Sequence, residues 1–433
     1  MRGKSKYLVL PITFLMLVNG STSWASIKIG SPCSAVGAKK TFQGTKLICV
    51  KSGKKLIWSK NVSSSNPSSK VATTQQMTDN RWYPWSFRFN QSGKLERRGG
   101  PITNWSTDGS RPGQEIDPIR IKAFEEISRW SKQSTRNPLE INFFFSPNLK
   151  KGVAATYRKY FDLSISFFEA QIPQESTLDV VVGTELDDEY FQKSFLEILG
   201  NQKEANDLFQ RNKGMIHQFD GEQGKSSSGG GTVGTTSQRN RFIYVGAVCS
   251  CAKPESLLMY NIPHEVTHFY QFAVTAGTPK QNFVGEWPNV TEGKIYLPLS
   301  LLEGSANTIG SALIVPHPGW YSDQMNWHLG RTKRRSVVPT IENEKQALEL
   351  MQQVRSYLPE KLGYAELGYS LGQLIWEYFI AQYGIENYFK LYSNIETLRD
   401  FDEAMMATIQ KTESDFYLEA APYVLRAYNA VSK

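Results

Sequence analysis

Two histidines four residues apart, with a glutamate directly after the first, constrain this chain more than any other feature. His264, Glu265 and His268 lie in the run Pro-His-Glu-Val-Thr-His. In an α-helix, residues at this spacing share one face and lie one turn apart. Both imidazoles can then bind one metal ion, and the glutamate can take a proton from a water molecule held there. The segment is therefore predicted to be a helix that carries a metal site.

Histidine is scarce in this sequence. The chain contains only five, so two of them in this register with a glutamate between them are unexpected by chance. The alternative interpretation is an ordinary helix with two incidental histidines. Pro263, directly before His264, removes one helical hydrogen bond and is expected to kink or restart the helix at that point.

A catalytic zinc ion usually has three protein ligands and a water molecule, so a third ligand is needed. Glu303 is the predicted third ligand, because it opens an apolar helix beside Gly304, where a neighbouring helix can approach closely. His317 and His328 are rival ligands, each in loop-like surroundings. A helix-capping carboxylate is the other interpretation of Glu303.

The two segments resemble the gluzincins, which are zinc metallopeptidases with a His-Glu-x-x-His helix and a glutamate ligand on the next helix. Residues 264–271 match the motif helix, and Glu303-Gly304-Ser305-Ala306 matches the Glu-Gly-x-Ala element. The resemblance implies a zincin-like fold and Zn²⁺ as the cofactor. It also implies a set of roles: His264, His268 and Glu303 as metal ligands, and Glu265 as the general base.

One departure from the family pattern concerns spacing. Glu303 follows His268 by 35 residues, which is wider than the usual gap. Residues 277–298 are rich in Gly and Pro, and they are interpreted as an inserted loop that could rim the cleft and select substrates.

Histidines that bind a metal need an acceptor for their other ring nitrogen. Asn307 lies four residues after Glu303 and therefore on the same helix face. Its amide oxygen is predicted to hold His264 or His268. An asparagine exposed on the helix surface is the alternative.

Hydrolysis also benefits from a donor directed at the developing oxyanion. Tyr369, in the run Gly-Tyr-Ser-Leu-Gly, resembles the Tyr-x-x-Gly element of aminopeptidase-like gluzincins. The resemblance implies a phenol donor at this position, on a helix that Tyr369 opens. Tyr364 and His328 are alternative donors, and a core tyrosine is the other interpretation of Tyr369.

Residues 1–25 have the pattern of an export signal. A basic stretch precedes the apolar run from Tyr7 to Val18, and the segment ends in the small-x-small site Ser23-Trp24-Ala25. The apolar run is short for a bilayer span, and an uncleaved anchor is the alternative. The protein is therefore expected to be secreted or associated with the cell surface, with no stable membrane span after signal cleavage.

Residues 26–60 are predicted to form a small basic module, followed by a flexible linker over 61–80. Cys33 and Cys49 lie in the module, where an exported chain can oxidise them to a disulfide. Such a bond stabilises a module with little core by roughly 3 kcal/mol. The module resembles a small repeat found N-terminal to other domains in exported actinobacterial proteins.

The net charge of +8 is concentrated near the N-terminus. Residues 1–80 contain twelve Lys and Arg against a single acid, Asp79, so the rest of the chain is net acidic. This distribution argues against a nucleic-acid partner. The basic module could bind an anionic cell-wall polymer, or it could be merely solubilising. A peptide or protein is the expected substrate.

The fold class is predicted to be α+β, with a mixed α/β lobe over 81–254 and a mainly helical lobe over 255–433 that carries the metal-binding helix. Irregular structure is expected over 81–111. The first lobe is expected to contain helices over 118–134, 151–170 and 187–209, and strands over 139–146, 176–183 and 242–248. The second is expected to contain helices over 255–276, 298–313, 344–358, 369–383, 386–395, 401–409 and 413–428.

Two further features allow several interpretations. Cys249 and Cys251 form a small strained ring, remain as two buried thiols, or bind a metal ion. The Gly/Ser/Thr run over 222–238 includes Gly224-Lys225-Ser226, which resembles the end of a phosphate-binding loop but lacks the leading glycine of that loop. A mobile loop beside the cleft is the preferred interpretation.

The main functional hypothesis is an exported zinc metallopeptidase. The first alternative is a surface-binding protein that keeps a gluzincin fold but has little or no catalytic activity. The second is a zinc amidase that acts on a cell-wall component. Glu265 favours catalysis, because binding alone does not require a base at that position.

Overall fold

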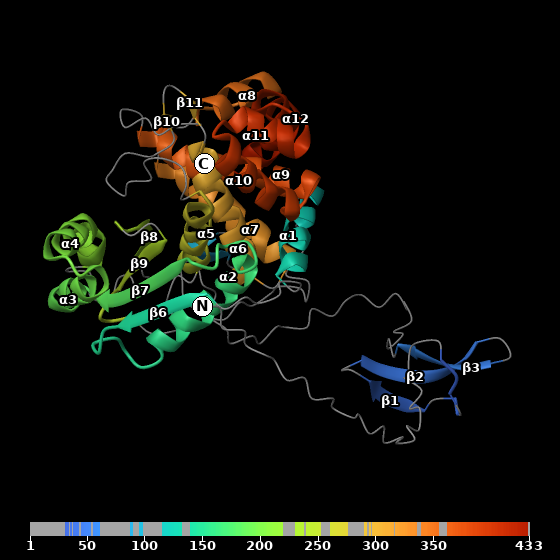
Figure 1. Cartoon of the computed structure of the whole chain (residues 1–433). Coiled ribbons are helices and arrows are strands. Elements are labelled where there is room, and N and C mark those ends of the chain that lie inside the picture. The colour runs from blue at the N-terminus through green and yellow to red at the C-terminus, as the bar shows by residue number, and fades with distance from the viewer. Residues whose placement is uncertain are drawn as a thin grey trace, which may run out of the picture. The chain divides into compact units, whose positions relative to one another are not determined.

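The computed structural model (Figure 1) divides into two units, Met1–Thr73 and Thr74–Lys433. The predicted signal at 1–25, the linker at 61–80 and most of the inserted loop at 277–298 lie outside the described residues. Apart from 34, 37, 43–44 and 53–54, the described residues are 31–60, 87–89, 95–97, 115–131, 139–219, 230–237, 240–252, 260–275, 290–291, 294–295, 297–315, 317–335, 339–354 and 362–431.

The first unit contains a three-stranded antiparallel sheet in the order β1-β2-β3. Its strands are β1 (Lys39–Phe42), β2 (Thr45–Ser52) and β3 (Lys55–Lys60). The predicted disulfide between Cys33 and Cys49 is confirmed. Cys49 is fully buried in β2, the central strand. The bond therefore joins the segment before β1 to the centre of the sheet.

The second unit contains a four-stranded sheet in the order β6-β7-β9-β8. The strands are β6 (Glu140–Phe145), β7 (Thr177–Thr184), β9 (Arg241–Val248) and β8 (Gly230–Thr235). The first three run parallel, and β8 pairs antiparallel to β9 at the edge. The apolar residues of β7 are buried throughout, as in a parallel strand covered on both faces.

The loop prediction for 222–238 is wrong over part of its length, because residues 230–235 form β8. The glycines there favoured the prediction of a loop, but the segment is a strand that pairs along its whole length with β9. Residues 220–229, including the Gly224-Lys225-Ser226 run, lie outside the described part.

Three helices accompany the sheet: α2 (Val153–Phe168), α3 (Asp188–Leu199) and α4 (Gln202–Ile216). The single helix predicted over 187–209 is wrong. Gly200 has a φ of 64° and ends α3, since glycine adopts this left-handed conformation without steric cost. Asn201 then starts α4, because its side chain accepts hydrogen bonds from the N–H groups of the first turn.

The rest of the unit is mainly helical. Among the described residues it contains α1 (Pro118–Trp130), α5 (Asn261–Val274), the π-helical turn η3 (Ser300–Gly304), α6 (Ser305–Ile314), α7 (Pro318–Arg335), α8 (Glu344–Gln353), α9 (Leu362–Tyr383), α10 (Ile385–Leu398), α11 (Phe401–Ile409) and α12 (Glu413–Asn429). Shorter elements are η1 (His217–Phe219), the hairpin of β4 (Phe87–Phe89) and β5 (Leu95–Arg97), and the pair β10 (Val290–Thr291) and β11 (Lys294–Ile295). The predicted α+β class is thus confirmed.

Helix α7 corrects the prediction of loop-like surroundings for His328, which lies inside the helix, whereas His317 lies just before it. The pattern Pro-His-Pro indicates an extended chain, yet Pro318 occupies the first position of α7, where the missing N–H costs no hydrogen bond.

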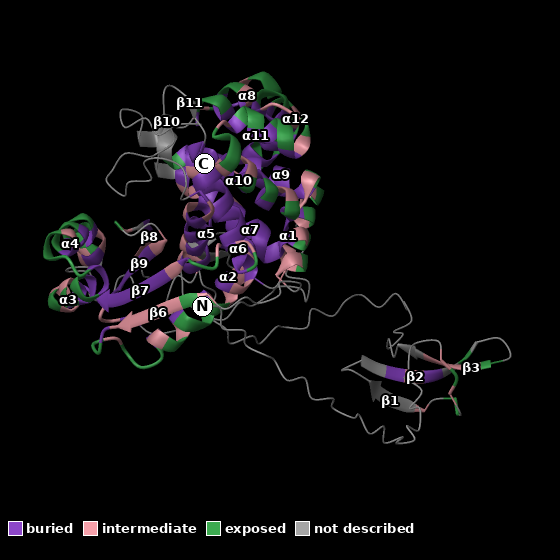
Figure 2. Ribbon diagram, viewed as in Figure 1, coloured by how far each residue is buried: buried purple, intermediate pink, exposed green. Residues whose placement is uncertain are grey.

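Helix α9 is the centre of the helical part. It packs against α1, η3, α6, α7 and α12, and its apolar side chains from Leu371 to Ile380 are almost entirely buried. Helix α1 precedes the sheet in sequence but packs mainly against α9. Helix α5 packs against β8, α2 and α6, so it lies where the sheet and the helices meet (Figure 2). No helix among the described residues is both long and apolar enough to cross a bilayer.

Candidate metal centre

Helix α5 carries the two histidines of the sequence motif. It begins at Asn261, later than the expected start at 255, and residues 253–259 lie outside the described part. Pro263 therefore falls in the first turn, where a proline needs no backbone partner. The His264 N–H still donates to the Tyr260 carbonyl at 3.1 Å. The helix is buried on nearly all sides, which fixes the direction of both imidazoles.

Glu303 reaches the same place from the next helical segment. It lies in the π-helical turn η3, which continues directly into α6. Such turns are rare in proteins, and those that do occur are frequently found at functional sites. Gly310 allows α6 to approach α5, since a Cβ atom there would lie 2.9 Å from the backbone nitrogen of His264.

The three predicted ligands are confirmed as one buried group that could hold a metal ion. His264 Nε2 lies 3.1 Å from His268 Nε2. Glu303 Oε2 lies 3.3 Å from His264 Nε2 and 3.2 Å from His268 Nε2. That oxygen makes no hydrogen bond to either ring, although it is directed at both. A cation shared by the three atoms would satisfy all of them, so the donor set fits a metal ion.

The charges of the group are strongly coupled. Burial is the largest single influence and lowers the pKa of His268, but its interactions with Glu303, Glu265 and Gln271 together outweigh burial and raise that pKa to about 9. Burial is likewise the largest single influence on Glu303 and raises its pKa, but the interactions with His268 and His264 together outweigh burial and lower that pKa to about 2. Without a metal ion, the pair therefore attracts a proton to the position that a cation would occupy.

Gln271 orients His268, and sequence reasoning missed it. Its Oε1 lies 2.7 Å from His268 Nδ1, which leaves Nε2 as the ring atom that faces Glu303. Its Nε2 donates to the Leu302 carbonyl at 3.1 Å and to the Ser305 hydroxyl at 3.0 Å. One amide thus links the histidine helix to the turn that carries the third ligand. The signal was present in the sequence, because residue 271 lies three after His268 on the same helix face.

Asn307 does not take the predicted role. Its amide nitrogen donates to the Tyr369 carbonyl at 3.2 Å, and its buried oxygen has no hydrogen-bond partner. The prediction of a bond to His264 or His268 is wrong because α6 turns this side chain towards α9. Asn307 instead joins those two helices beside the site.

Glu265 is held by the edge of the sheet. The backbone N–H of Val233, in β8, donates to Glu265 Oε2 at 3.0 Å. Burial raises the pKa of Glu265 above its ordinary value, although the two histidines oppose that rise. A buried carboxylate of raised pKa beside a metal group is suited to accept a proton. This contact was not predicted, because a loop rather than a strand was expected over residues 230–235.

A cavity of about 390 Å³ opens onto this group, and its lining includes His264, Glu265 and Tyr369. The Tyr369 ring stacks on the His264 ring with centroids 6.3 Å apart and planes 6° apart. Burial raises the pKa of Tyr369 well above its ordinary value, and the Glu303 charge adds to this effect. Tyr369 lies within α9 rather than at its start. It therefore presents a protonated phenol beside the metal group.

The rival residues do not join the metal group. His317 lies just before α7 with its ring 5.6 Å from that of Trp320. His328 lies in α7 and lines the cavity, and its Nε2 atom is 2.8 Å from Gln324 Nε2. Tyr364 lies in the first turn of α9, and its role as an alternative donor stays a prediction.

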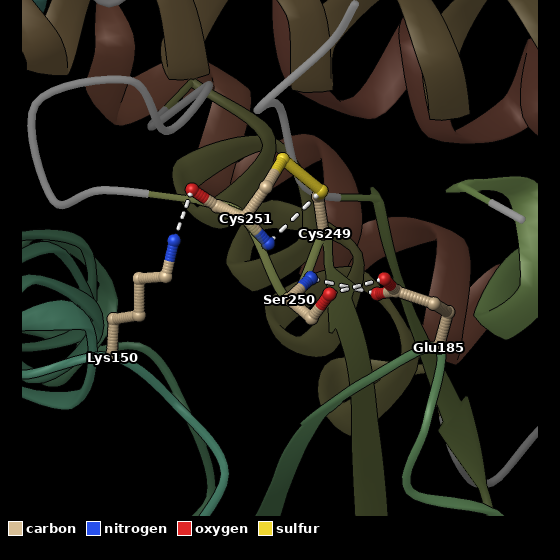
Figure 3. The surroundings of a disulfide bond; sticks show 5 residues. All are labelled: Lys150, Glu185, Cys249, Ser250 and Cys251. Atoms are coloured by element: carbon tan, nitrogen blue, oxygen red, sulfur yellow. Dashed lines mark hydrogen bonds between the residues drawn. A yellow bond between two sulfur atoms is a disulfide. The ribbon is translucent and has the colours of Figure 1, made fainter. Parts of the chain in front are cut away.

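The second cysteine pair forms a disulfide at the end of β9, between Cys249 and Cys251 (Figure 3). Glu185 accepts hydrogen bonds from the Ser250 backbone N–H at 2.7 Å and hydroxyl at 2.6 Å. Lys150 Nζ donates to the Cys251 carbonyl at 2.8 Å. Of the three interpretations, the small disulfide ring is confirmed. Neither sulfur is therefore a thiolate available to a metal ion.

No protein-family model matches the chain, and comparisons with curated proteins and with solved structures gave no match. The residues of the metal group and their geometry therefore carry the functional inference.

Proposed function

We propose that this chain is an exported zinc metallopeptidase with a zincin-like fold, as its resemblance to the gluzincins implies. The observation that carries the proposal is the position of Glu303 Oε2, 3.3 Å from His264 Nε2 and 3.2 Å from His268 Nε2. Glu265 adjoins this group in the wall of a cavity. A ligand set, a base and a space for substrate thus occur together.

Zinc fits both the donor types and their spacing. Two imidazoles and one carboxylate are a usual ligand set for catalytic zinc, which keeps a fourth position open. Tetrahedral zinc bonds of about 2.0–2.1 Å place ligand atoms about 3.3 Å apart. The separations here are 3.1, 3.2 and 3.3 Å. The wholly oxygen sites preferred by magnesium and calcium differ from this group.

A zinc ion in this position supplies a Lewis acid that polarises the scissile carbonyl and acidifies water. Glu265 takes a proton from the attacking water and delivers it to the leaving amine. The Val233 N–H holds one carboxylate oxygen, which leaves the other free to face the water. Tyr369 remains protonated because of its raised pKa, so its hydroxyl can donate to the oxyanion.

The edge of the sheet supports a peptide as the substrate. The Val233 N–H points away from β9 towards Glu265, whereas the Thr236 N–H donates inwards to the Arg241 carbonyl. Because strand residues alternate in direction, Gly231 presents its backbone groups to the same open edge as Val233. Gly231 also lines the cavity. An extended peptide can add to such an edge through backbone hydrogen bonds.

Export is part of the proposal, and the two disulfides support it, because such bonds persist in oxidising compartments. We also propose that the basic N-terminal module binds an anionic cell-wall polymer. A catalytically weak binding protein and a zinc amidase acting on a cell-wall component remain the alternatives.

The decisive experiment compares the wild-type chain with Glu265→Gln. We expect equal zinc content and thermal stability, and at least a ~100-fold lower rate of cleavage of a broad peptide library, since the variant lacks the base. Glu349→Gln, at an exposed position of α8, is the matched control and should cleave normally. Full turnover by Glu265→Gln would exclude this base. Bound zinc without cleavage by the wild type would favour the binding alternative.

A further inference from the structure

The cavity beside the metal group has a single strongly basic residue. Among its described lining residues, Arg331 is the only Lys or Arg. It is half-buried and projects from α7, next to the lining residues His328 and Thr332. A guanidinium group carries its charge at every physiological pH. The cavity therefore has a permanent positive charge in its wall.

No carboxylate of the described part forms an ion pair with this guanidinium. The guanidinium instead lies over the ring of Trp327, four residues earlier in α7, whose centroid is 5.6 Å from the guanidinium carbon. Arg120, which is buried, differs in this respect, because it pairs with Glu377 at 3.2 Å. A partly desolvated charge without a partner is costly, so such groups are normally paired.

Arg331 lies close enough to the metal group to act on the same substrate. Burial lowers the pKa of His328, and the charge of Arg331 adds to that effect. The same charge opposes the burial-driven rise in the pKa of Tyr260. The Tyr260 ring lies 5.1 Å from that of His328 and 6.1 Å from that of His264, which is a metal ligand. Arg331, Tyr260 and His264 all line one cavity.

We infer that Arg331 binds a carboxylate of the substrate and so selects peptides that carry one near the scissile bond. This inference rests on the proposed function, because it concerns what the same cavity binds. A guanidinium matches a carboxylate in two parallel hydrogen bonds, and the ring of Trp327 beneath it limits its rotation. In a peptide, the carboxylate is either the C-terminus or an Asp or Glu side chain.

The test uses Arg331→Ala and Arg331→Lys in the full chain, with four alanine-based hexapeptides as probes. Two of them end in a free carboxylate or in an amide, and two amidated ones contain an internal Glu or Gln. We expect the wild type to prefer one carboxylate peptide over its neutral partner by at least tenfold in kcat/KM. Arg331→Ala should abolish the preference mainly through KM, and Arg331→Lys should retain part of it. The pair that responds identifies the source of the carboxylate.

Arg211→Ala is the matched control, since Arg211 is exposed on α4, forms no ion pair with another described residue and is not among the described residues that line the cavity. It should keep the wild-type preference. An equal loss for charged and neutral peptides in Arg331→Ala, or no change in their ratio, would overturn the inference.

Calorimetric binding of the same hexapeptides to Glu265→Gln separates this inference from the proposed function. Carboxylate-dependent binding that disappears in the double variant Glu265→Gln/Arg331→Ala supports the inference even if the wild type cleaves no peptide. Cleavage by the wild type without any preference between the paired peptides contradicts the inference while leaving the hydrolytic function intact.

Discussion

Gly304 and Gly372 lie backbone against backbone where the turn that carries Glu303 crosses α9. A Cβ atom on Gly372 would lie 3.1 Å from Gly304 Cα and 2.7 Å from the Ser300 carbonyl oxygen. The helices can approach this closely only because neither residue has a side chain. Glu303, the proposed third metal ligand, is thus positioned by the backbone of α9 as well as by its own turn.

The first prediction tests this contact. Gly304→Ala forces η3 and α9 apart, so we expect a loss of about 1–3 kcal/mol in the free energy of unfolding, with weaker zinc binding. Urea unfolding and chelator competition measure the two effects. Gly214→Ala in α4 is the control, because nothing lies within 4 Å of the added Cβ, and it should be neutral or stabilising. Unchanged zinc affinity in Gly304→Ala would show that the crossing does not position Glu303.

The second prediction concerns Gln271. Gln271→Leu removes the acceptor of His268 Nδ1 and the link to η3, so we expect zinc affinity to fall roughly 10–100-fold. Competition with a fluorescent zinc chelator measures this change. Thr267→Val is the control on the same helix, since the buried Thr267 hydroxyl bonds only to the Pro263 carbonyl. Equal affinities in the two variants would contradict the role assigned to Gln271.

The third prediction concerns the pH dependence of the metal-free protein. The pKa of His268 is raised from 6.5 to about 9, so its stabilising contribution is complete below pH 6.5 and is lost as pH rises to 9. The pKa of Glu303 is lowered from 4.5 to about 2, so its contribution is present above pH 4.5 and is lost as pH falls towards 2. Thermal unfolding after chelator treatment should therefore show a Tm that declines from pH 6.5 to 9.

Two measurements accompany this pH series. His268→Gln should remove the alkaline decline in Tm, because the titrating ring is gone. Zinc affinity of the wild type should rise over the same pH range, because the ion must displace the proton from His268. A flat Tm between pH 6.5 and 9 would contradict the coupling between the two residues.

The fourth prediction concerns the buried ion pair that joins α1 to α9. Arg120 Nε lies 3.2 Å from Glu377 Oε1, and Arg120 also donates to the side chain of Asn326 at 2.6 Å. Glu377→Leu leaves the arginine buried without its counter-charge, and we expect a loss of about 3–5 kcal/mol in urea unfolding. The double variant Arg120→Met/Glu377→Leu should lose less than the sum of the single changes. Additive losses would show that the pair is not coupled.

The sequence predicted the metal group because its signals are local. The spacing of His264 and His268 dictates a shared helix face, and a carboxylate beside Gly304 indicates a close helix approach. Their grouping is confirmed. The bond predicted for Asn307 failed because spacing specifies a helix face but not the direction in which a packed helix turns that face. Only the contact with α9 decides this.

The elements that were missed share a different cause. Strand β8 is rich in glycine, and its pairing with β9 is a tertiary contact that local composition does not reveal. Its Val233 N–H is nevertheless the group that orients Glu265. Helix α7 was not predicted, because the prolines around His317 are typical of an extended chain. The helix nevertheless supplies both His328 and Arg331 to the cavity. These parts of the proposed site thus depend on long-range packing.

The π-helical turn makes the number of residues near Glu303 as important as their identity. Such a turn contains one residue more than an α-helical turn. Deleting Gly304, which separates Glu303 from α6, would let η3 become regular α-helix and would rotate Glu303 by about 100° relative to α6. A carboxylate could be retained in the sequence and still face away from the histidines. An aligned glutamate in a shorter chain would thus be a poor guide to whether that chain binds a metal ion.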